Sequence, residues 1–500
     1  MVKVPLYING EMRQSESNEW LDVVNPANQE VLAQVPLATD SEIDEAIASA
    51  KETFQTWKDV PVTERARIMM RYAALLKEHH DELATIICHE LGKTFEDAKG
   101  DVWRGIEVVE QAANAPALMM GETVENVARN IDTYSYMQPL GVCAGITPFN
   151  FPAMIPLWMF PMAIVCGNTF ILKPSARAPS CANVLARLFS DAGLPDGVFN
   201  VVHGDKIAVD HILQHDGIEA VSFVGSTAVA EYIYHTGTAH NKRVQALGGA
   251  KNHAIIMPDA DIDQAVDAMI GAAFGSAGER CMALSVAVAV GDDVADNMIA
   301  KIKDQAENIK VGCGMVSGNE MGPLITKEHC ARVKGLITEG ESQGAKVALD
   351  GRNFEGPEGK ESGYFCGPTI LDNVTKDMSV YKEESFGPVL VVVRVDSYDK
   401  AVQLVQDHEY GNGTCIFTRD GDIARNFTRK IKIGMVGVNV PLPVPLAFHS
   451  FGGWKRSIFG DHHMYGPEGV RFWTKIKTVT TRWPTSIMAG ANLSFPSSGC

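Results

Sequence analysis

The spacing of apolar residues predicts amphipathic helices in the first part of the chain. After Thr39, apolar side chains recur every three or four positions as far as Trp57, the period of a helix buried on one face. Thr39 also stands three residues before Glu42, the arrangement of a capping box at a helix start. A second run with this spacing follows Pro61 and continues towards Gly92, which predicts one long helix.

After a third predicted helix around 102–113, which carries Arg104, the pattern changes to short apolar runs separated by helical spacing. The runs are 141–147, 169–172, 198–202, 220–224 and 254–257, and the helical stretches are 179–192, 206–214 and 227–236. This is the rhythm of strands alternating with helices in a parallel sheet. A nucleotide site is then expected at the carboxyl ends of the strands.

The same alternation returns after about residue 250. Its apolar runs and helical stretches are 285–290, 293–309, 389–395 and 398–406. The predicted fold class is therefore α/β, with two doubly wound parallel-sheet domains. Two further segments, 131–138 and the Thr-rich 475–482, alternate like strands and predict a small β extension.

The stretch from Thr133 to Leu172 contains no charged residue and is long enough to span a bilayer. Its prolines would break a spanning helix, because proline lacks an N–H and clashes with the preceding turn. They are Pro148, Pro152, Pro156 and Pro161. We therefore interpret the stretch as buried core and expect no membrane association. The first residues lack the features of a signal peptide, so a cytoplasmic protein is expected.

Net charge narrows the range of partners. The chain has 61 acidic and 44 basic residues and a formal charge of −17. Nucleic acids and anionic membranes are bound through clustered Lys and Arg, so neither is expected as a partner. The ten cysteines show no Cys-x-x-Cys spacing, which favours a reducing compartment over a disulfide framework. The paired histidines at 79–80 and 462–463 lack ligand partners at suitable spacing, so no metal site is predicted.

Cys281 is the first candidate for covalent chemistry. It follows a glycine-bearing turn in the segment Phe-Gly-Ser-Ala-Gly-Glu-Arg-Cys, and Arg280 directly precedes it. Backbone amides and a neighbouring cation would favour the thiolate, which is the nucleophilic form. Taken alone this pattern is weak, since most buried free cysteines act as small apolar residues.

Five further motifs accompany this segment. They are Ile146-Thr-Pro-Phe-Asn150-Phe-Pro152, Phe170-Ile-Leu-Lys173-Pro-Ser175, Phe223-Val-Gly225-Ser226-Thr227, Leu247-Gly248-Gly249 and Glu383-Glu384-Ser-Phe386-Gly-Pro388. In this order they resemble the aldehyde dehydrogenase superfamily, and the resemblance runs from Tyr7 to Val479. The segments 278–281 and 438–445 resemble its CoA-acylating branch, the methylmalonate-semialdehyde dehydrogenases.

The resemblance implies how the chain is divided. It implies a nucleotide-binding domain at 1–120 and 141–247, a catalytic domain at 248–440, and oligomerisation strands at 121–140 and 465–490. It also implies a homotetramer or homodimer whose subunits are joined by strand addition.

The resemblance also implies roles for individual residues. Cys281 is implied as the nucleophile that adds to an aldehyde carbon, and Asn150 as a hydrogen-bond donor to the oxyanion that then forms. A turn-forming Asn between two prolines is the alternative for Asn150. NAD is the implied cofactor. The residues implied to bind it are Thr147, Phe149, Lys173, Arg177, Gly225, Ser226, Glu384 and Phe386.

One departure from the family pattern concerns the fate of the thioester. Most members carry Glu-Leu-Gly-Gly, whose Glu activates water for hydrolysis, whereas this chain has Ala246-Leu-Gly-Gly249. Without that base the acyl-enzyme should persist until a thiol arrives, and coenzyme A is the implied co-substrate. Glu279 is an alternative base, although we expect the adjacent Arg280 to hold it in an ion pair.

A second departure concerns the cofactor. Many NAD-using relatives have an acidic residue three positions after the strand lysine, where it reads the adenosine ribose. This chain has Ala176 followed by Arg177. An arginine can pair with a 2′-phosphate, so NAD is expected and NADP is left open.

Two arginines indicate an acidic substrate. In the resembling branch, an arginine on the third helix and one beside the nucleophile are associated with the acidic semialdehyde, and Arg104 and Arg280 occupy those places. A solvated surface arginine is the alternative for Arg104. The resemblance implies oxidation of methylmalonate or malonate semialdehyde, with loss of CO₂, to propanoyl-CoA or acetyl-CoA in valine, thymine or inositol-type catabolism. The other candidates are a hydrolytic dehydrogenase that releases a free acid and a non-catalytic relative.

Overall fold

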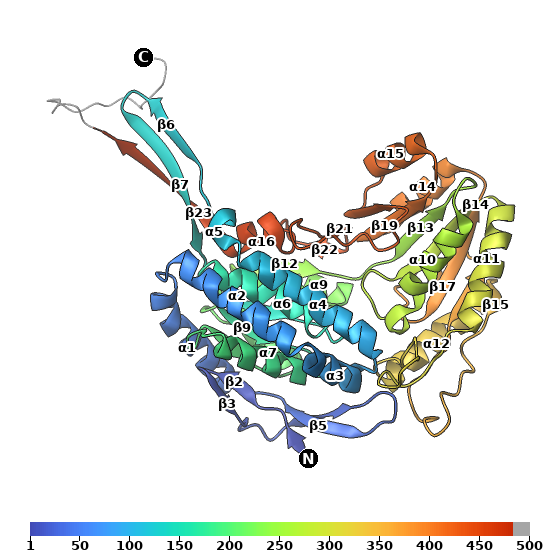
Figure 1. Ribbon diagram of the computed structural model, residues 1–500, viewed down its shortest axis with the longest axis horizontal. Helices are drawn as coiled ribbons and strands as arrows, with labels where there is room; N and C mark the ends of the chain where they lie inside the picture. The colour runs from blue at the N-terminus through green and yellow to red at the C-terminus, as the bar shows by residue number, and fades with distance from the viewer. Residues whose placement is uncertain (484–500) are drawn as a thin grey trace.

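The computed structural model describes residues 1–483, which form two α/β lobes and a narrow sheet that projects from the first lobe (Figure 1). Of the strands expected at 465–490, the residues from 484 onward lie outside the described part.

An eight-stranded sheet forms the centre of the first lobe. Its five middle strands are parallel, as the sequence predicts, and antiparallel strands close both edges. In order across the sheet the strands are β22 (Ile458–Phe459), β12 (Arg243–Leu247), β11 (Ala220–Val224), β8 (Val142–Ile146), β9 (Thr169–Lys173), β10 (Phe199–Val201), β2 (Leu6–Ile8) and β3 (Glu11–Arg13). Strand β12 was not predicted, because Arg243 and Gln245 interrupt its apolar pattern.

Helices and one small sheet surround these strands. The helices are α1 (Asp40–Trp57), α2 (Val62–Glu78), α3 (His80–Leu91), α4 (Phe95–Ala112), α5 (Ala115–Leu118), α6 (Met154–Val165), α7 (Ser180–Asp191), α8 (Lys206–Gln214), α9 (Thr227–Ala239) and α16 (Gly466–Trp473). The small sheet contains β1 (Val2–Lys3), β5 (Val31–Pro36) and β4 (Trp20–Val24).

The predicted helix starts and ends are partly right. The capping box before α1 is confirmed, since the Thr39 hydroxyl accepts from the Glu42 N–H and the Glu42 carboxylate accepts from the Thr39 N–H. The single long helix after Pro61 is wrong, because a non-helical residue, His79, separates α2 from α3. Apolar spacing continues across the break since Leu76 and Leu83 enter the same core.

A seven-stranded sheet forms the second lobe, and six of its strands run parallel. In order they are β15 (Lys346–Leu349), β16 (Thr369–Asp372), β17 (Val389–Val395), β14 (Leu284–Val290), β13 (Asn252–Ile256), β19 (Gly413–Phe417) and β20 (Met435–Val438). The helices of this lobe are α10 (Ile262–Phe274), the 3₁₀ turn η1 (Gly275–Gly278), α11 (Asp292–Glu307), α12 (Lys327–Ser342), α13 (Ser379–Lys382), α14 (Tyr398–Asp407) and α15 (Gly421–Lys430). A two-stranded pair, β18 (Tyr410–Gly411) and β21 (Trp454–Lys455), lies outside this sheet.

The uncharged stretch 133–172 forms the end of β7, then β8, α6 and β9, and α6 is buried at every position. No single helix spans the stretch, as expected, although the 12-residue α6 itself contains Pro156 in its first turn and Pro161 further on. A first-turn proline costs little, since its N–H would have no partner within the helix. The interpretation as buried core is confirmed. None of the described helices is long and apolar enough to cross a membrane.

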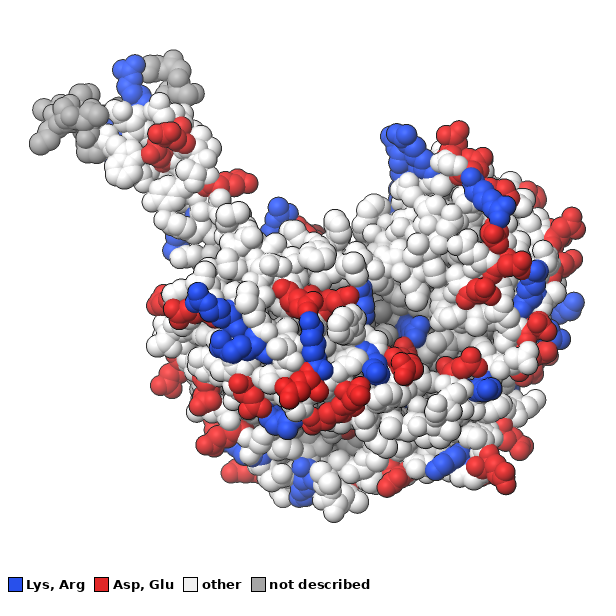
Figure 2. All heavy atoms as spheres, viewed as in Figure 1, with Lys and Arg blue, Asp and Glu red and all other residues white. Residues whose placement is uncertain are grey.

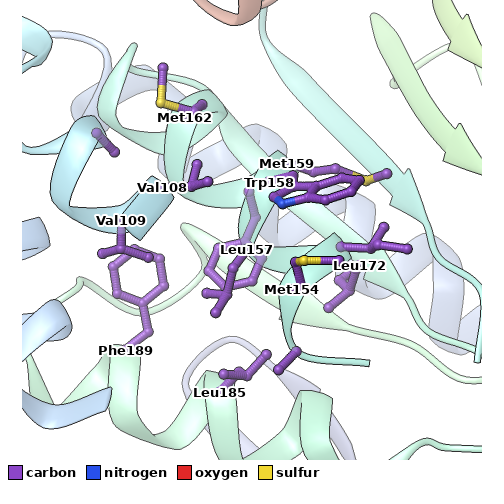
Figure 3. Close-up of a cluster of buried hydrophobic side chains, with 14 of the residues drawn as sticks. Val108, Val109, Met154, Leu157, Trp158, Met159, Met162, Leu172, Leu185 and Phe189 are labelled. Carbon is purple, nitrogen blue, oxygen red and sulfur yellow. The ribbon is translucent and has the colours of Figure 1, made fainter. Parts of the chain in front are cut away.

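Helix α6 packs against α4 on one side and α7 on the other (Figure 3). Leu157 and Trp158 of α6 lie in a cluster with Val109 of α4 and Phe189 of α7 (Figure 3). Burying each such side chain stabilises the fold by about 1.5–3 kcal/mol. This core fixes the position of α4, which carries Arg104.

The projecting sheet contains β6 (Thr123–Ala128), β7 (Ile131–Pro139) and β23 (Thr474–Arg482), all antiparallel (Figure 1). Both strands predicted here are confirmed. Apolar side chains stand exposed on this sheet, among them Val124, Tyr136 and Ile476.

The face drawn in Figure 2 carries acidic and basic side chains side by side and is hollowed where the two lobes meet. The net charge of −17 is therefore not gathered in one acidic patch on this face.

Candidate active site

Cys281 follows the turn η1 and lies where the two lobes meet. Its backbone carbonyl accepts hydrogen bonds from the side-chain amides of Asn252, at 2.9 Å, and Asn412, at 3.1 Å. The Asn252 amide also donates to the Ala283 carbonyl at 3.0 Å. Asn252 begins β13 and Asn412 directly precedes β19, two inner strands of the second sheet, so these contacts fix the backbone around the thiol.

A cavity of about 340 Å³ opens beside Cys281. Most of its wall is apolar, and two arginines stand in that wall. The residues that line it are Asp97, Gly100, Asp101, Arg104, Phe151, Met154, Trp158, Val224, Leu247, Gly248, Arg280, Cys281, Met282, Asn412, Leu442, Val444 and Phe451. The structure thus brings Arg104 of α4 to the same cavity as Arg280 and Cys281, although Arg104 is far from these two residues in the chain.

Each arginine is already held by protein groups. Arg104 donates to the Pro445 carbonyl and to the Glu107 carboxylate, both at 2.8 Å. Arg280 donates to the Asp97 carboxylate at 2.6 Å. A guanidinium has five N–H donors, so both side chains keep donors for a further acceptor.

Burial and the backbone amides act on the pKa of the Cys281 thiol in opposite directions: burial raises it, whereas the amides of Cys281 and Met282 lower it, as the sequence predicts. Burial and the nearby Glu384 carboxyl raise the pKa of the Cys281 thiol to about 11. Arg280 does not counter this effect, because its guanidinium is paired with Asp97. Deprotonation therefore has to accompany the attack on a substrate.

Asn150 is buried at the loop after β8, near the same segment. Its side-chain N–H₂ donates to the backbone carbonyl of Glu279 at 3.0 Å. An amide nitrogen carries two hydrogens, so one remains for another acceptor. Asn150 thus contacts the nucleophile segment from the first lobe, whereas it does not line the cavity that contains the two arginines.

Thr147 and Lys173 lie at the carboxyl ends of adjacent parallel strands, where a nucleotide is expected. The Thr147 N–H donates to the Lys173 carbonyl at 3.1 Å. The Thr147 hydroxyl is buried without a hydrogen-bond partner, and burial lowers the pKa of the Lys173 ammonium to about 8. Both are polar groups in place for an absent ligand. Arg177, four residues further on, is exposed.

Gly225 and Ser226 form the turn between β11 and α9. Ser226 is the N-cap of α9, yet its side chain makes no capping hydrogen bond. The first amides of this helix are therefore available to an anion such as a pyrophosphate. Gly225 is required by space, since a Cβ there would lie 2.4 Å from the Phe223 ring.

Glu384 and Phe386 approach from the second lobe. Glu384 accepts from the Ala250 N–H at 3.0 Å, and burial raises the pKa of its carboxyl to about 7. Phe386 adopts a left-handed backbone, with φ of 49°, and its ring meets that of Phe149 edge to face at 6.0 Å. These groups, with Thr147 and the α9 terminus, are of the kinds that hold a dinucleotide, so the residues present fit one.

Comparison with known proteins agrees with this geometry. The aldehyde dehydrogenase family matches residues 12–479. The chain belongs to the aldehyde dehydrogenase family. This confirms the predicted membership and makes the protein an oxidoreductase.

Several relatives of this aldehyde dehydrogenase are highly similar over their whole length. The malonate-semialdehyde dehydrogenase of Pseudomonas aeruginosa is 56% identical over 98% of each chain. The human mitochondrial acylating methylmalonate-semialdehyde/malonate-semialdehyde dehydrogenase is 49% identical over 96% of this chain and 89% of its own. The crystal structure of methylmalonate-semialdehyde dehydrogenase from Oceanimonas doudoroffii superposes with a TM-score of 0.96 at 56% identity, covering 97% of this chain and 99% of that one. A Sinorhizobium meliloti relative solved with NAD has the same TM-score at 52% identity and the same coverage.

In this aldehyde dehydrogenase the pocket-facing position on β12 is 247, not 246. Side chains alternate along a strand. Ala246 packs in the core on the far side of the sheet with Phe223 and Val244, whereas Leu247 lines the cavity. The expectation that position 246 corresponds to the family's catalytic Glu is therefore corrected. Leucine occupies the place from which β12 faces the cavity.

The expected pairing of Glu279 with Arg280 is also wrong. The two side chains part, because Arg280 turns to Asp97 while the Glu279 carboxylate accepts from the Ile325 N–H at 3.1 Å. Burial raises the pKa of Glu279 to about 8. It lies with Asn150 beside a cavity that Cys281 does not line.

Sequence reasoning missed three charged residues behind the nucleophile. They are Lys93, Asp97 and Asp101. The Lys93 ammonium lies 3.4 Å from the Asp101 carboxylate and 3.7 Å from the centre of the Phe151 ring. A signal was present, since Asp97 and Asp101 precede Arg104 at spacings of seven and three residues, which places all three on one face of α4.

Proposed function

We propose that this chain is an NAD-dependent, CoA-acylating semialdehyde dehydrogenase that acts on malonate or methylmalonate semialdehyde. The expected products are acetyl-CoA or propanoyl-CoA with loss of CO₂. The names of the relatives at 49–56% identity support this substrate class.

One observation carries the proposal. Two guanidinium groups, Arg104 and Arg280, stand in the wall of a largely apolar cavity that also contains Cys281. A short semialdehyde has a carboxylate at one end and an aldehyde at the other. An arginine can hold the first while the thiol reaches the second. An apolar cavity without arginines would suit an uncharged aldehyde instead.

The proposed chemistry begins at the Cys281 sulfur. The thiol gives its proton to water as sulfur bonds to the aldehyde carbon, and the carbonyl electron pair moves to oxygen. We propose the free Asn150 N–H and the Cys281 backbone N–H as the donors to this oxyanion, since one such donor typically contributes about 2.7–4 kcal/mol. NAD held in its site would supply the acceptor for the hydride that leaves the same carbon. A thioester on Cys281 remains.

The thioester then loses the neighbouring carboxylate as CO₂, and a proton takes its place on carbon. The CoA thiol adds to the thioester carbon and Cys281 leaves, so that the acyl group moves from sulfur to sulfur without oxidation or reduction. Leu247 supports transfer to a thiol, because a leucine cannot activate water.

For the cofactor we propose NAD, held by Thr147, Lys173, the α9 terminus, Glu384 and Phe386. The relative solved with NAD supports this choice. Arg177 is exposed and carries no acidic neighbour at position 176, so NADP remains a second candidate.

NADH formation with and without CoA tests the acylating claim. With CoA we expect continuous turnover, and without CoA a single burst that stops at one NADH per active site. Full turnover without CoA, with release of free acid, would mean a hydrolytic dehydrogenase. Cys281→Ser should abolish both phases, and unchanged turnover in that variant would overturn the mechanism.

We propose that 1–120 and 141–247 bind the nucleotide, that 248–440 carries the nucleophile, and that the projecting sheet joins subunits in a homotetramer or homodimer. The exposed apolar residues on β6, β7 and β23 support the last point.

A further inference from the structure

The turn before Cys281 runs through left-handed backbone at three successive residues. The values of φ are 52° at Ser276 and Ala277 and 73° at Gly278. At Gly278 a side chain is excluded, because a Cβ would lie 2.1 Å from the Gly387 carbonyl. Left-handed backbone at Ser and Ala costs free energy and persists only where neighbouring groups hold it. The surroundings of this turn must therefore contain such a group.

Asp97 contacts both sides of this turn. One of its carboxylate oxygens accepts from the Ser276 hydroxyl, at the start of the left-handed run. The other accepts from the Arg280 guanidinium at 2.6 Å, one residue before the nucleophile. A single carboxylate thus bridges the turn that precedes Cys281.

Asp97 is itself fixed by the other lobe. It lies in the first turn of α4, and its backbone N–H donates to the hydroxyl of the N-cap residue Thr94. The side chains of Asp97 and Arg280 are only 20% and 19% exposed. Although burial opposes ionisation, Lys93 and Arg280 hold the pKa of Asp97 below its usual value. The bridge therefore connects two charged groups in a largely dry place.

The guanidinium of Arg280 lies against the turn. Its second amino group reaches the Gly271 carbonyl of α10 at 3.3 Å, and a Cβ on Gly275 would lie 2.5 Å from it. Only the contact with Asp97 is charged and short. Without it, nothing comparable among the described contacts would keep this guanidinium beside Cys281.

We propose that Asp97 is a positioning residue for acid specificity, which holds the Arg280 guanidinium and the 276–278 turn so that a substrate carboxylate is bound at a set distance from Cys281. The inference rests on the proposed function in one respect, namely that the substrate carries a carboxylate. Asp97 acts through Arg280 and takes no part in the bond changes.

Alkylation of Cys281 tests this without cofactor or turnover. Iodoacetate and iodoacetamide have nearly the same shape and differ in charge, and mass spectrometry of the Cys281 peptide gives the rate for each. The ratio of the two rates, relative to that of a free thiol, reports how well the pocket attracts a carboxylate. The iodoacetamide rate by itself reports whether the thiol is still in place.

The variants are Asp97→Ala, Asp97→Asn, Arg280→Ala and the double variant Asp97→Ala/Arg280→Ala. We expect Asp97→Ala to lower the ratio by about tenfold, as Arg280→Ala does, and the double variant to show no further loss, since both changes remove one interaction. Asp97→Asn keeps the shape and an acceptor oxygen, so its ratio should stay within about threefold of the wild type. Ser276→Ala leaves the Arg280 contact intact and removes the contact to the turn, so it should keep the ratio and lower the rate with iodoacetamide, which reports the position of the thiol.

Three results would overturn the inference. If Asp97→Ala keeps or raises the ratio while Arg280→Ala lowers it, Asp97 only adds negative charge to the pocket. If Asp97→Asn falls as far as Asp97→Ala, charge rather than position is responsible. If the wild type and Arg280→Ala have the same ratio, the pocket does not select carboxylates, and the proposed substrate fails together with the specificity role of Asp97.

Discussion

Leu247 is the residue that favours transfer to CoA over hydrolysis in the proposed reaction. It faces the cavity from β12, while Ala246 is buried on the other side of the sheet. We expect Leu247→Glu to supply a base to water and to raise thioester hydrolysis without CoA, by about 10²-fold if the carboxylate is well placed. Ala246→Glu should give no hydrolysis and should destabilise the fold, because it places a carboxylate in the core.

The measurement is release of free acid in the absence of CoA, followed by mass spectrometry for both variants. Hydrolysis that rises in Ala246→Glu and not in Leu247→Glu would contradict the assigned orientation of β12.

Glu279 should give the protein a measurable pH dependence of stability. Its pKa is raised to about 8 by burial, whereas the unfolded carboxyl titrates near about 4.3. Between these values the unfolded chain releases a proton that the folded chain keeps, so wild-type stability falls as pH rises through this window. In Glu279→Gln this contribution is absent.

Thermal unfolding from about pH 5 to about pH 8 should therefore show a flatter profile for Glu279→Gln than for the wild type. Glu52→Gln, at an exposed position of α1, serves as the control and should leave the profile unchanged. A profile of the same slope in Glu279→Gln would show that the carboxyl is ionised in the folded protein.

At the scale of residues, sequence patterns could indicate which side chains belong to the site but not how they pair. Arg280 directly follows Glu279 in the chain, and yet its partner is Asp97, 183 positions away. The same limit explains the thiol, because the burial that raises the pKa of Cys281 depends on packing between the lobes. Neither the Arg280–Asp97 pair nor this packing can be predicted from the spacing of neighbouring residues.

At the scale of elements, the close packing of α4 on α6 is the feature that places Arg104 and Asp97. A Cβ on Gly105 of α4 would lie 2.4 Å from a methyl carbon of Leu157 on α6. We expect Gly105→Ala to destabilise the protein by about 1–3 kcal/mol through overpacking and to lower activity as α4 shifts.

Gly100→Ala on the same helix is the matched control. No atom lies within 4 Å of a Cβ there, so the change should raise stability by up to about 1 kcal/mol through helix propensity. Urea unfolding midpoints measure both variants. If both midpoints shift in the same direction, the contact between α4 and α6 does not explain the effect of Gly105→Ala on stability.

Many elements could be predicted from their patterns, whereas others, among them α6, α10, α12 and β12, were not predicted. Strands β11 and β17 match their predicted ends, since continuous apolar runs mark strands buried on both faces. The break at His79 escaped prediction because the core on both sides keeps the apolar period. Strand β12 was not predicted because Arg243 and Gln245 leave no continuous apolar run longer than two of its five residues.

At the scale of the whole molecule, the projecting sheet is the part that we propose joins subunits. Ile476 on β23 is 67% exposed, which is unusual for an isoleucine on a strand. We expect Ile476→Glu to split the assembly into smaller species, because a charge would be buried at the subunit contact. Analytical ultracentrifugation gives the mass of each species.

Lys477→Glu changes a neighbour that points to the other face of β23, and it serves as the control. If Ile476→Glu keeps the wild-type mass, the projecting sheet does not join subunits through this face.

The central claim is that this aldehyde dehydrogenase transfers its acyl group to CoA. The most direct test supplies methylmalonate semialdehyde, NAD and CoA together and identifies the product by mass spectrometry. We expect propanoyl-CoA and CO₂ in equal amounts with NADH. Methylmalonate as the product, with CoA unused, would contradict it.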